Sequence, residues 1–484
     1  MKAFSRQSIN PCIIATQYAV RGKLVLEANE IQKEIEEARK KGKNNPYPFE
    51  KVVYCNIGNP QICNQQPLTY PRQIISIVEY PELLNHTALF PKDVINHAKK
   101  IINSLGCTGT SGAYTNSMGV IQFRKTICKF IKHRDGTAPS PDDVFITDGA
   151  STGIKMILNM LISHPLHGIM IPIPQYPLYS ASISQFGGFQ INYFLDESKK
   201  WSTDMTSVRK VYEQAVEKGI QVKGFVCINP GNPTGQVLTV QNMKEIIEFC
   251  YEKKICLLAD EVYQENIYGE IPFTSFRKVL KSMRDEVKNS VELISFFSVS
   301  KGFYGECGKR GGYFQIENIN SFARSQMYKI ASTNLCSNVV GQEMVEIICN
   351  PPKEGDESYP KYMNEKMSIL NSLKRKAKLL HSVLNECEGI SCNEAMGALY
   401  LFPKITFPNK FIDECKRKDQ KPDELYCLRM LKSIGVCVVP GSGFGQKDNT
   451  YHFRIAILPP ENEIQNIAIK IKTFHTSFMK EYSH

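Results

Sequence analysis

The feature that most constrains the fold is a regular alternation of short apolar runs and helical stretches between about residues 143 and 297. The runs at 255–259 and 291–297 are short enough to be buried strands, and residues 240–253 have the pattern of a helix. Strands that alternate with helices predict a mostly parallel sheet covered by helices. Ligands of such sheets bind beyond the carboxyl ends of the strands, so the residues that follow each run are the first candidates for a site.

The chain after residue 350 predicts a second, smaller unit. Pro351-Pro352 and the polar run to Pro360 are typical of a linker, and residues 361–387 have the pattern of a long charged helix. Short apolar runs at 398–402 and 436–439 then predict strands on either side of a helix. We therefore expect two domains joined by the long helix.

The end of the strand at 291–297 carries a lysine among hydroxyls. Ser298, Ser300 and Lys301 follow the strand, glycines let the backbone approach a ligand, and Arg310 closes the loop. Hydroxyls and an arginine suit a phosphate, and a lysine desolvated in a site becomes nucleophilic toward an aldehyde. Taken alone, Ser-x-Ser-Lys is a short pattern that more often describes a surface loop with a solvated lysine.

A second group of candidate phosphate ligands follows the strand at 143–147. Residues 148–153 form a small-residue turn that opens a helix, where free amides and the helix dipole favour an anion and Ser151 adds a hydroxyl. The absence of Gly-x-Gly-x-x-Gly gives no support to a dinucleotide fingerprint. Tyr114, in a glycine-containing loop at 109–119, could donate its hydroxyl to a phosphate or pack on a neighbour.

Two further strand ends carry groups suited to a planar ligand. Tyr176 could stack on a ring or pack in the core, and core packing is expected more for Tyr179. Asn232 lies in a run of turn formers at 229–235, where two Asn-Pro steps make a cis bond plausible. A cis bond there would direct the Asn232 side chain into a site.

Charged and small residues complete the set of candidates. Asp260 and Tyr263 follow the strand at 255–259, and Gly58, which ends a predicted strand at 52–58, either lies against a substrate or serves a turn. Arg454 stands in an otherwise apolar strand and needs an anionic partner. That partner is either a buried carboxylate of the protein or the carboxylate of a substrate, held by two hydrogen bonds.

Pyridoxal phosphate needs the groups that these strand ends supply. The cofactor requires a lysine for its aldehyde, a carboxylate for its pyridine nitrogen, donors for its phenolate oxygen, a stacking ring and a phosphate cup. Lys301 and Asp260 suit the first two needs, Tyr263 and Asn232 the third, and Tyr176 the fourth. The predicted phosphate ligands are Ala150, Ser151, Ser298, Ser300 and Arg310.

The order and rough spacing of these motifs closely resemble those of the aspartate-aminotransferase-like class of pyridoxal-phosphate enzymes. The resemblance rests on Asn232-Pro-Thr-Gly235, Asp260-Glu-Val-Tyr263, Ser298-x-Ser-Lys301 and Arg454. Longer stretches at 173–180, 228–237 and 301–312 are similar to the alanine-aminotransferase subgroup. The likeness extends from about residue 8 to the end of the chain.

The resemblance implies pyridoxal-phosphate transferase fold type I, an α/β fold. A large domain with a mostly parallel seven-stranded sheet flanked by helices would be joined by a smaller α/β domain built from both chain ends. The expected limits are 1–90 for an N-terminal arm and part of the small domain, 91–360 for the large cofactor-binding domain, and 361–484 for the C-terminal part of the small domain.

The activity that the resemblance implies is that of an alanine transaminase, which converts L-alanine and 2-oxoglutarate into pyruvate and L-glutamate by a ping-pong scheme. Lys301 would be the Schiff-base lysine and carry the proton, and the substrate carboxylate would lie on Arg454, Asn232 and the backbone near Gly58. Such enzymes are typically homodimers, in which Tyr114 would reach the partner subunit's phosphate. Glutamate or alanine:glyoxylate aminotransferase, or another class I or II aminotransferase, is the alternative.

One departure from the class pattern bears on these assignments. The spacing from lysine to arginine is one residue longer than in most of the class, so that Lys309 stands where the shorter spacing would place a cation. Arg310 is preferred because Arg-Gly-Gly matches the subgroup. A catalytically inactive binding protein with this fold is a rival hypothesis, which intact Lys301, Asp260 and Arg454 disfavour.

Composition sets limits on other classes of protein. The formal charge of +11, from 59 basic and 48 acidic residues, is modest and suits anionic metabolites as well as nucleic acid, for which no fold motif is present. Sixteen cysteines without Cys-x-x-Cys pairs or metal spacing indicate reduced thiols. Without an 18-residue apolar run or a signal-peptide core, we expect a cytoplasmic enzyme rather than a mitochondrial one, with no membrane or nucleic-acid partner.

Overall fold

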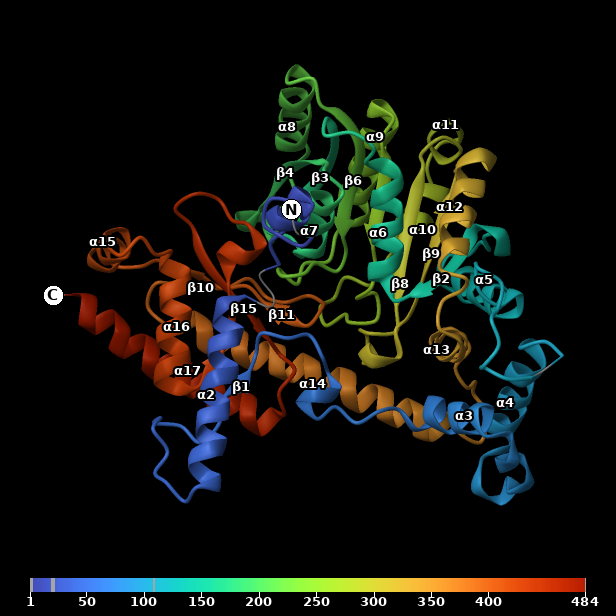
Figure 1. Ribbon diagram of the computed structural model, residues 1–484, viewed down its shortest axis with the longest axis horizontal. Coiled ribbons are helices and arrows are strands. Elements are labelled where there is room, and N and C mark those ends of the chain that lie inside the picture. Colours follow the sequence, from blue (N-terminus) through green and yellow to red (C-terminus); the bar gives the residue numbers. More distant parts are fainter. Residues whose placement is uncertain (1–2, 19–21, 108, 484) are drawn as a thin grey trace.

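A large mixed sheet forms the centre of the computed structural model, which describes residues 3–18, 22–107 and 109–483 (Figure 1). Its eight strands lie in the order β2-β9-β8-β7-β6-β3-β4-β5. Their bounds are β2 (Val144–Asp148), β3 (His167–Ile173), β4 (Phe189–Asp196), β5 (Ser202–Thr203), β6 (Gln221–Ile228), β7 (Cys256–Asp260), β8 (Leu293–Ser298) and β9 (Gly311–Glu317). The five strands from β8 to β4 in this order run parallel.

The mostly parallel sheet that the sequence predicted is confirmed, and the structure adds two strands to the predicted runs. β9 begins directly after Arg310 and pairs antiparallel with both β8 and β2, and all its residues are buried. β5 pairs antiparallel with the end of β4. The family resemblance implied seven strands in this sheet. The sheet has eight, because the two-residue strand β5 extends one edge.

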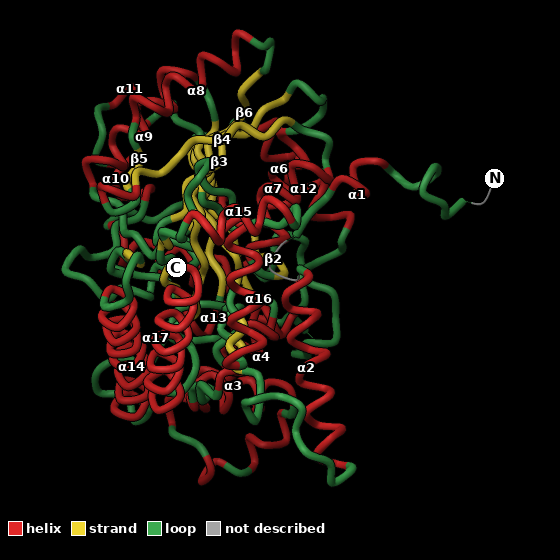
Figure 2. The backbone as a smooth tube through the Cα atoms, turned by 90° about the vertical axis from the view of Figure 1, so that its left-hand side faces the viewer, coloured by secondary structure: helices red, strands yellow, loops and turns green. Residues whose placement is uncertain are grey.

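Helices cover both faces of the sheet (Figure 2). On one face lie α6 (Ala150–Leu161), α7 (Leu178–Gln185) and α12 (Ser321–Thr333), and on the other α8 (Met205–Glu217), α9 (Val240–Lys253), α10 (Phe276–Lys281) and α11 (Asp285–Lys288). Because side chains alternate along a strand, Leu257 of β7 packs with α9 and Leu258 packs with α6. Burying each of these leucines stabilises the fold by about 1.5–3 kcal/mol.

The edge of the sheet at β2 and β9 is covered by four further helices. They are α3 (Thr69–Glu79), α4 (Lys92–Ser104), α5 (Ile121–Asp135) and α13 (Val339–Cys349). Helix α3 ends before Pro81, and α4 begins after Pro91. A proline lacks the amide hydrogen that a continuous helix would need.

The rest of the chain forms the smaller α/β unit. β15 (Tyr451–Ala456) pairs antiparallel with β11 (Tyr400–Leu401), β12 (Lys404–Ile405) and β14 (Val439–Pro440), and β12 pairs with β10 (Ile390–Ser391). β1 (Val53–Tyr54) pairs in parallel with β13 (Val436–Cys437). Because β1 and β13 come from opposite ends of the chain, both ends build this unit, as predicted.

Helices complete the small unit and connect it to the large one. The small unit carries α2 (Lys23–Lys40), α15 (Asn409–Arg417), α16 (Pro422–Ile434) and α17 (Glu461–Ser483), and α1 (Pro11–Ala15) lies on α7 of the large unit. The long helix α14 (Tyr359–Asn385) runs below the large sheet in Figure 1 and packs on α17 of the small unit, as expected of the predicted connecting helix. Among the described residues, no helix has the length and apolar character to span a membrane.

Candidate active site

A cavity of about 270 Å³ lies between the carboxyl ends of the large sheet's strands and the small unit. We call it the Lys301 cavity. Its lining contains every site residue predicted from the sequence except Tyr114, namely Gly58, Ala150, Ser151, Tyr176, Asn232, Asp260, Tyr263, Ser298, Ser300, Lys301, Arg310 and Arg454. Tyr18, Cys307 and Tyr400 also line it and were not predicted.

One end of the Lys301 cavity gathers hydrogen-bond donors. The Arg310 guanidinium donates to the hydroxyls of Ser151 and Ser300 at 3.3 and 3.4 Å, and to the carbonyl of Asp148 at 3.2 Å. Helix α6 begins at Ala150, so its free N-terminal amides face the same place. This end of the cavity therefore has the donors and the positive charge that a phosphate needs.

The choice of Arg310 over Lys309 is consistent with this arrangement, because Arg310 lines the cavity and Lys309 is not among the lining residues. A glycine beside the arginine makes room for it. Gly149 has a φ of +73°, and a Cβ atom there would lie 2.4 Å from Arg310 Nη2. Only glycine satisfies both the backbone conformation and this close approach.

Lys301 lies in the middle of the cavity. Its Nζ donates a hydrogen bond of 2.6 Å to the carbonyl oxygen of Gly58. The loop that follows Lys301 is held from outside by the N-terminal segment, since Gln65 donates to the Phe303 carbonyl at 2.9 Å and Arg72 pairs with the buried Glu306 at 2.9 Å. Segments more than 200 residues apart therefore position the lysine.

Asp260 lies at the carboxyl end of β7, where it is buried. The Tyr179 hydroxyl donates to Asp260 Oδ2 at 2.9 Å. Burial raises the pKa of Asp260 to about 6, while the bonds from Tyr179 and Val262 and the charge of Lys301 act to lower it. Tyr179 is fully buried, as expected, but it also orients the carboxylate, a role that its position in the sequence did not indicate.

Arg454 forms the opposite end of the cavity and is only 1% exposed. It donates to Asn232 Oδ1 at 3.0 Å and to the carbonyl of Asn56 at 2.5 Å, and its Nε has no partner among the described residues. Because none of the described acidic side chains forms an ion pair with it, the alternative of a buried protein carboxylate finds no support. A buried guanidinium with a free donor and no acidic partner among the described residues suits an incoming anion.

Aromatic rings hold the Arg454 guanidinium in place. Its central carbon lies 4.0 Å from the ring centroid of Tyr400 and 4.7 Å from that of Phe444. The Tyr400 hydroxyl also explains why residue 58 is a glycine, because a Cβ atom there would lie 1.9 Å from it. The close approach of Tyr400 is a third reason for a glycine at this position, beside the two roles considered from the sequence, which stay open.

Tyr18 and Tyr114 differ in where they lie relative to the Lys301 cavity. The hydroxyl of Tyr18 lies 2.9 Å from that of Tyr176, so the N-terminal arm reaches the cavity. Tyr114 is 78% exposed, in the loop between α4 and α5, and does not line the cavity of its own chain. No spacing signal in the sequence indicates a role for Tyr18, since 158 residues separate it from Tyr176.

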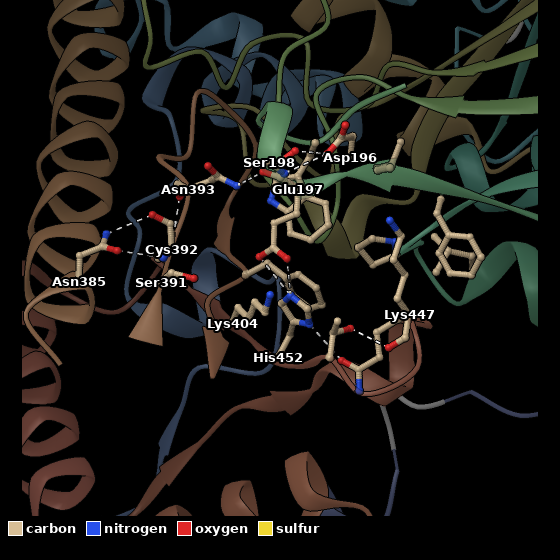
Figure 3. Close-up of a pocket in the computed structure, with 18 residues that line it drawn as sticks. Asp196, Glu197, Ser198, Asn385, Ser391, Cys392, Asn393, Lys404, Lys447 and His452 are labelled. Carbon is tan, nitrogen blue, oxygen red and sulfur yellow. Dashed lines mark hydrogen bonds and ion pairs between the residues drawn. The ribbon is translucent and has the colours of Figure 1, made fainter. Parts of the chain in front are cut away.

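A larger crevice of about 540 Å³ lies beyond the end of β4, against the small unit (Figure 3). His452 and Glu197 meet across it at 3.2 Å. Lys404 and Lys447 also line it. Its buried histidine already has an acidic partner, and none of the described residues that line it is a buried carboxylate. The smaller cavity contains both a lysine and the buried Asp260, so it is the better candidate for chemistry.

Comparison with known proteins places the chain in one family. It matches the family model described as aminotransferase class I and II over residues 79–471. It is 47% identical over 471 residues to a probable mitochondrial alanine aminotransferase of Dictyostelium discoideum, covering 96% of this chain and 88% of that protein. It is 44% identical over 487 residues to glutamate–glyoxylate aminotransferase 2 of Arabidopsis thaliana, covering 100% and 98%.

A solved structure has the same fold. An alanine aminotransferase from Pyrococcus furiosus superposes with a TM-score of 0.74 at 24% identity, covering 97% of this chain and 99% of that one. The residues of the Lys301 cavity fit the cofactor of the family, because they offer one lysine, one buried carboxylate, a donor cluster for phosphate and a separate, unpaired guanidinium. The chain belongs to the class I and II aminotransferases, which depend on pyridoxal phosphate.

Proposed function

We propose that the protein is an alanine transaminase, which exchanges the amino group between L-alanine and 2-oxoglutarate to give pyruvate and L-glutamate. The observation that carries the proposal is the buried Arg454, which lines the same small cavity as Lys301 and forms no ion pair with any acidic side chain that the structure describes. An α-carboxylate bound there would leave the amino group near the lysine. The choice of alanine is supported by relatives named alanine aminotransferase at 46–47% identity.

The cofactor, when bound, supplies an aldehyde for the amino group and a ring that accepts electrons from the α-carbon. Lys301 would bind the aldehyde and, once released, accept and return the substrate proton at Nζ. Asp260, in its ionised form, would keep the pyridine nitrogen protonated. Tyr263 and Asn232 would donate to the phenolate oxygen, and Tyr176 would cover one face of the ring.

The donor end of the cavity would hold the phosphate. Its members lie close to the end of a strand or the start of a helix or strand, and they are Ala150, Ser151, Ser298, Ser300 and Arg310. The opposite end would hold the substrate. Arg454 would bind the α-carboxylate by two parallel hydrogen bonds, Asn232 would support it, and Gly58 would leave room beside it.

Absorbance of the purified enzyme carrying its cofactor tests this proposal. L-Alanine should bleach the visible band and release pyruvate, and 2-oxoglutarate should restore the band, because the half-reactions alternate. A protein that binds no cofactor under any condition would contradict the proposal, and so would one whose band does not respond to alanine.

A second candidate activity is transfer to glyoxylate. It is supported by glutamate–glyoxylate aminotransferases of Arabidopsis thaliana that are 44% identical to the whole chain. Parallel assays of the two acceptors after bleaching with alanine distinguish the candidates. Restoration of the band by glyoxylate and not by 2-oxoglutarate would replace the first activity with the second.

We also propose a homodimer in which Tyr114 reaches the phosphate of the partner subunit. The proposal is supported by the exposure of Tyr114 and by its absence from the cavity of its own chain. Sedimentation analysis should give a dimer, and Tyr114→Phe should weaken cofactor binding while the dimer stays intact. A monomer that retains full activity would contradict both parts of the proposal.

The cytoplasmic location stays a prediction, and relatives from Dictyostelium discoideum and Arabidopsis thaliana carry the word mitochondrial in their names. Fractionation of cells that produce the native protein checks it. Recovery with the mitochondrial fraction would overturn the expected location without affecting the proposed activity.

A further inference from the structure

Tyr400 has no role in the proposed function, although it is buried in the Lys301 cavity. It lies on β11, where it pairs with Ala456 of β15, and is 2% exposed. That pairing brings its ring against Arg454, two residues earlier on β15, with the guanidinium carbon 4.0 Å from the ring centroid. The ring is therefore one wall of the site that would hold the substrate carboxylate.

The hydroxyl of Tyr400 lies beside the amine of Lys301. A Cβ atom built on Gly58 would be 1.9 Å from the Tyr400 oxygen and 3.0 Å from Lys301 Nζ. The two groups therefore flank one glycine, whose carbonyl also accepts the hydrogen bond from the lysine. The Tyr263 hydroxyl lies 3.4 Å from the Tyr400 hydroxyl.

Charge distinguishes Tyr400 from the other tyrosines of the cavity. Burial raises the pKa of Tyr400, but the positive charges of Lys301 and Arg454 and the hydrogen bond from Tyr263 outweigh it and lower the pKa overall. Burial instead raises the pKa of Tyr176 and Tyr263 well above the ordinary value. A cation on either side thus favours the ionised form of one tyrosine only.

Other ionisable groups also face this pair. Cys307 acts against ionisation of Tyr400, and it lies near Gly58, with Sγ 3.8 Å from the glycine carbonyl. Asp260 faces Lys301 from β7, and the lysine charge helps to keep its carboxyl ionised. Arg310 and Tyr18 line the cavity but are not among the main influences on Tyr400.

We propose that Tyr400 is a positioning residue for the two cations of the site. Its ring holds the guanidinium of Arg454, and its hydroxyl, when ionised, stabilises the Lys301 ammonium by charge. This inference rests on the proposed role of Lys301 as the base, and it adds the group that supports that base.

The proton balance involves only the substrate and Lys301. When Lys301 has taken up the substrate proton, its ammonium lies close to the Tyr400 oxygen, because both groups flank Gly58. The phenolate stabilises this ammonium without taking its proton. Lys301 then returns the same proton to the substrate, so no other reactant is needed.

A spectroscopic titration tests the hydroxyl without any turnover. In the cofactor-free protein, the ultraviolet difference titration should show one tyrosine that ionises below the ordinary tyrosine pKa of about 10, and Tyr400→Phe should remove it. Tyr268→Phe is the matched control, because Tyr268 is equally buried and donates to the Ala398 carbonyl at 2.7 Å, but burial raises its pKa. Identical titrations of the wild type and Tyr400→Phe would overturn the inference.

Kinetics with the cofactor bound test the effect on Lys301. Without the phenolate, the Lys301 ammonium is less stable, so the acid limb of the kcat profile should move to lower pH in Tyr400→Phe. The weaker base should lower kcat by on the order of tenfold, less than the loss of a direct acid–base group. The KM for alanine should stay nearly constant, because the phenylalanine ring still covers Arg454. A changed KM with an unmoved pH profile would leave only a packing role and contradict the proposal.

Tyr400→Leu tests the role of the ring, whereas Tyr400→Phe tests the role of the hydroxyl. It removes the contact with the guanidinium, and the KM for alanine should rise by about tenfold, as expected for a desolvated cation–π contact. An unchanged KM would contradict the role assigned to the ring. If Lys301→Ala abolishes turnover while the tyrosine titration is the same with and without Tyr400, this inference fails and the proposed function stands.

Discussion

The two ends of the Lys301 cavity are built differently for the anions that we propose they bind. At the donor end, the exposed Arg310 is joined by Ser151, Ser300 and the start of α6. At the opposite end, the buried Arg454 lies between two rings. Several donors around an exposed arginine suit a phosphate that stays bound, whereas one desolvated, rigid cation suits a carboxylate that must be recognised and released in every cycle.

The two ends also differ in how the chain builds them. The donor end comes from two short stretches, 148–151 and 298–310, each at the end of one strand. The carboxylate end brings together Asn56, Asn232, Tyr400 and Arg454, and the hydrogen bond between Arg454 and the Asn56 carbonyl joins positions 398 residues apart. Substitutions at each end should therefore affect different kinetic quantities.

Lys301→Ala should have the largest effect, because we propose that this residue binds the cofactor aldehyde and also moves the substrate proton. Turnover should fall by at least about 10³-fold, since no other amine among the described residues lines the cavity to act as the base. The measurement is the rate of pyruvate formation together with the visible spectrum. Transamination near the wild-type rate would contradict the assignment of Lys301, whatever the state of the two ends.

Arg454→Ala should act on substrate binding. Charge-assisted hydrogen bonds contribute about 1.5–3 kcal/mol each, so the KM for alanine should rise on the order of 10²-fold. Steady-state kinetics and a cofactor titration check it, and cofactor affinity should change little. Arg454→Lys keeps the charge without the two parallel donors and should rescue only part of the loss. An unchanged KM for alanine in Arg454→Ala would place the carboxylate elsewhere.

Arg310→Ala should show the reverse pattern, with a smaller magnitude. Because Ser151, Ser300 and the helix amides remain, cofactor affinity should fall by about tenfold, as for an exposed charged hydrogen bond. The KM for alanine, measured at saturating cofactor, should stay within experimental error. Lys309→Ala is the matched control and should leave cofactor affinity unchanged. Equal effects of Arg310→Ala on both quantities would remove the distinction between the two ends.

The smallest expected effect is a pH dependence of cofactor affinity, which arises from Asp260. Burial raises the pKa of its carboxyl to about 6, so the carboxylate takes up a proton and loses its charge as the pH falls through that value. Cofactor affinity should therefore weaken by roughly fourfold from about pH 7.5 to about pH 5.5. Asp260→Asn should bind weakly at both pH values. A wild-type affinity that is independent of pH would contradict this role for Asp260.

Much of the donor end could be predicted from the sequence, because strand, turn and helix start are local patterns. The same reasoning does not predict β9, because Gly311 and Gly312 at its start are typical of a loop. That strand forms because β8 and β2 supply partners on both sides, which no local pattern contains. Tyr179 was also missed as a partner of Asp260, because helix packing, not spacing, brings the two together.

The sequence by itself determined the alternating strands and helices, the chemical groups at the strand ends and the need of Arg454 for an anion. Those properties depend on residues a few positions apart, whose geometry is set by the periods of helix and strand. Only the tertiary structure decided that Tyr400 covers Arg454, that Gly58 makes room for the Tyr400 hydroxyl, and that no described acidic side chain pairs with the guanidinium. Strand register and the contact between the two units set these distances, and both come from burial shared by distant segments.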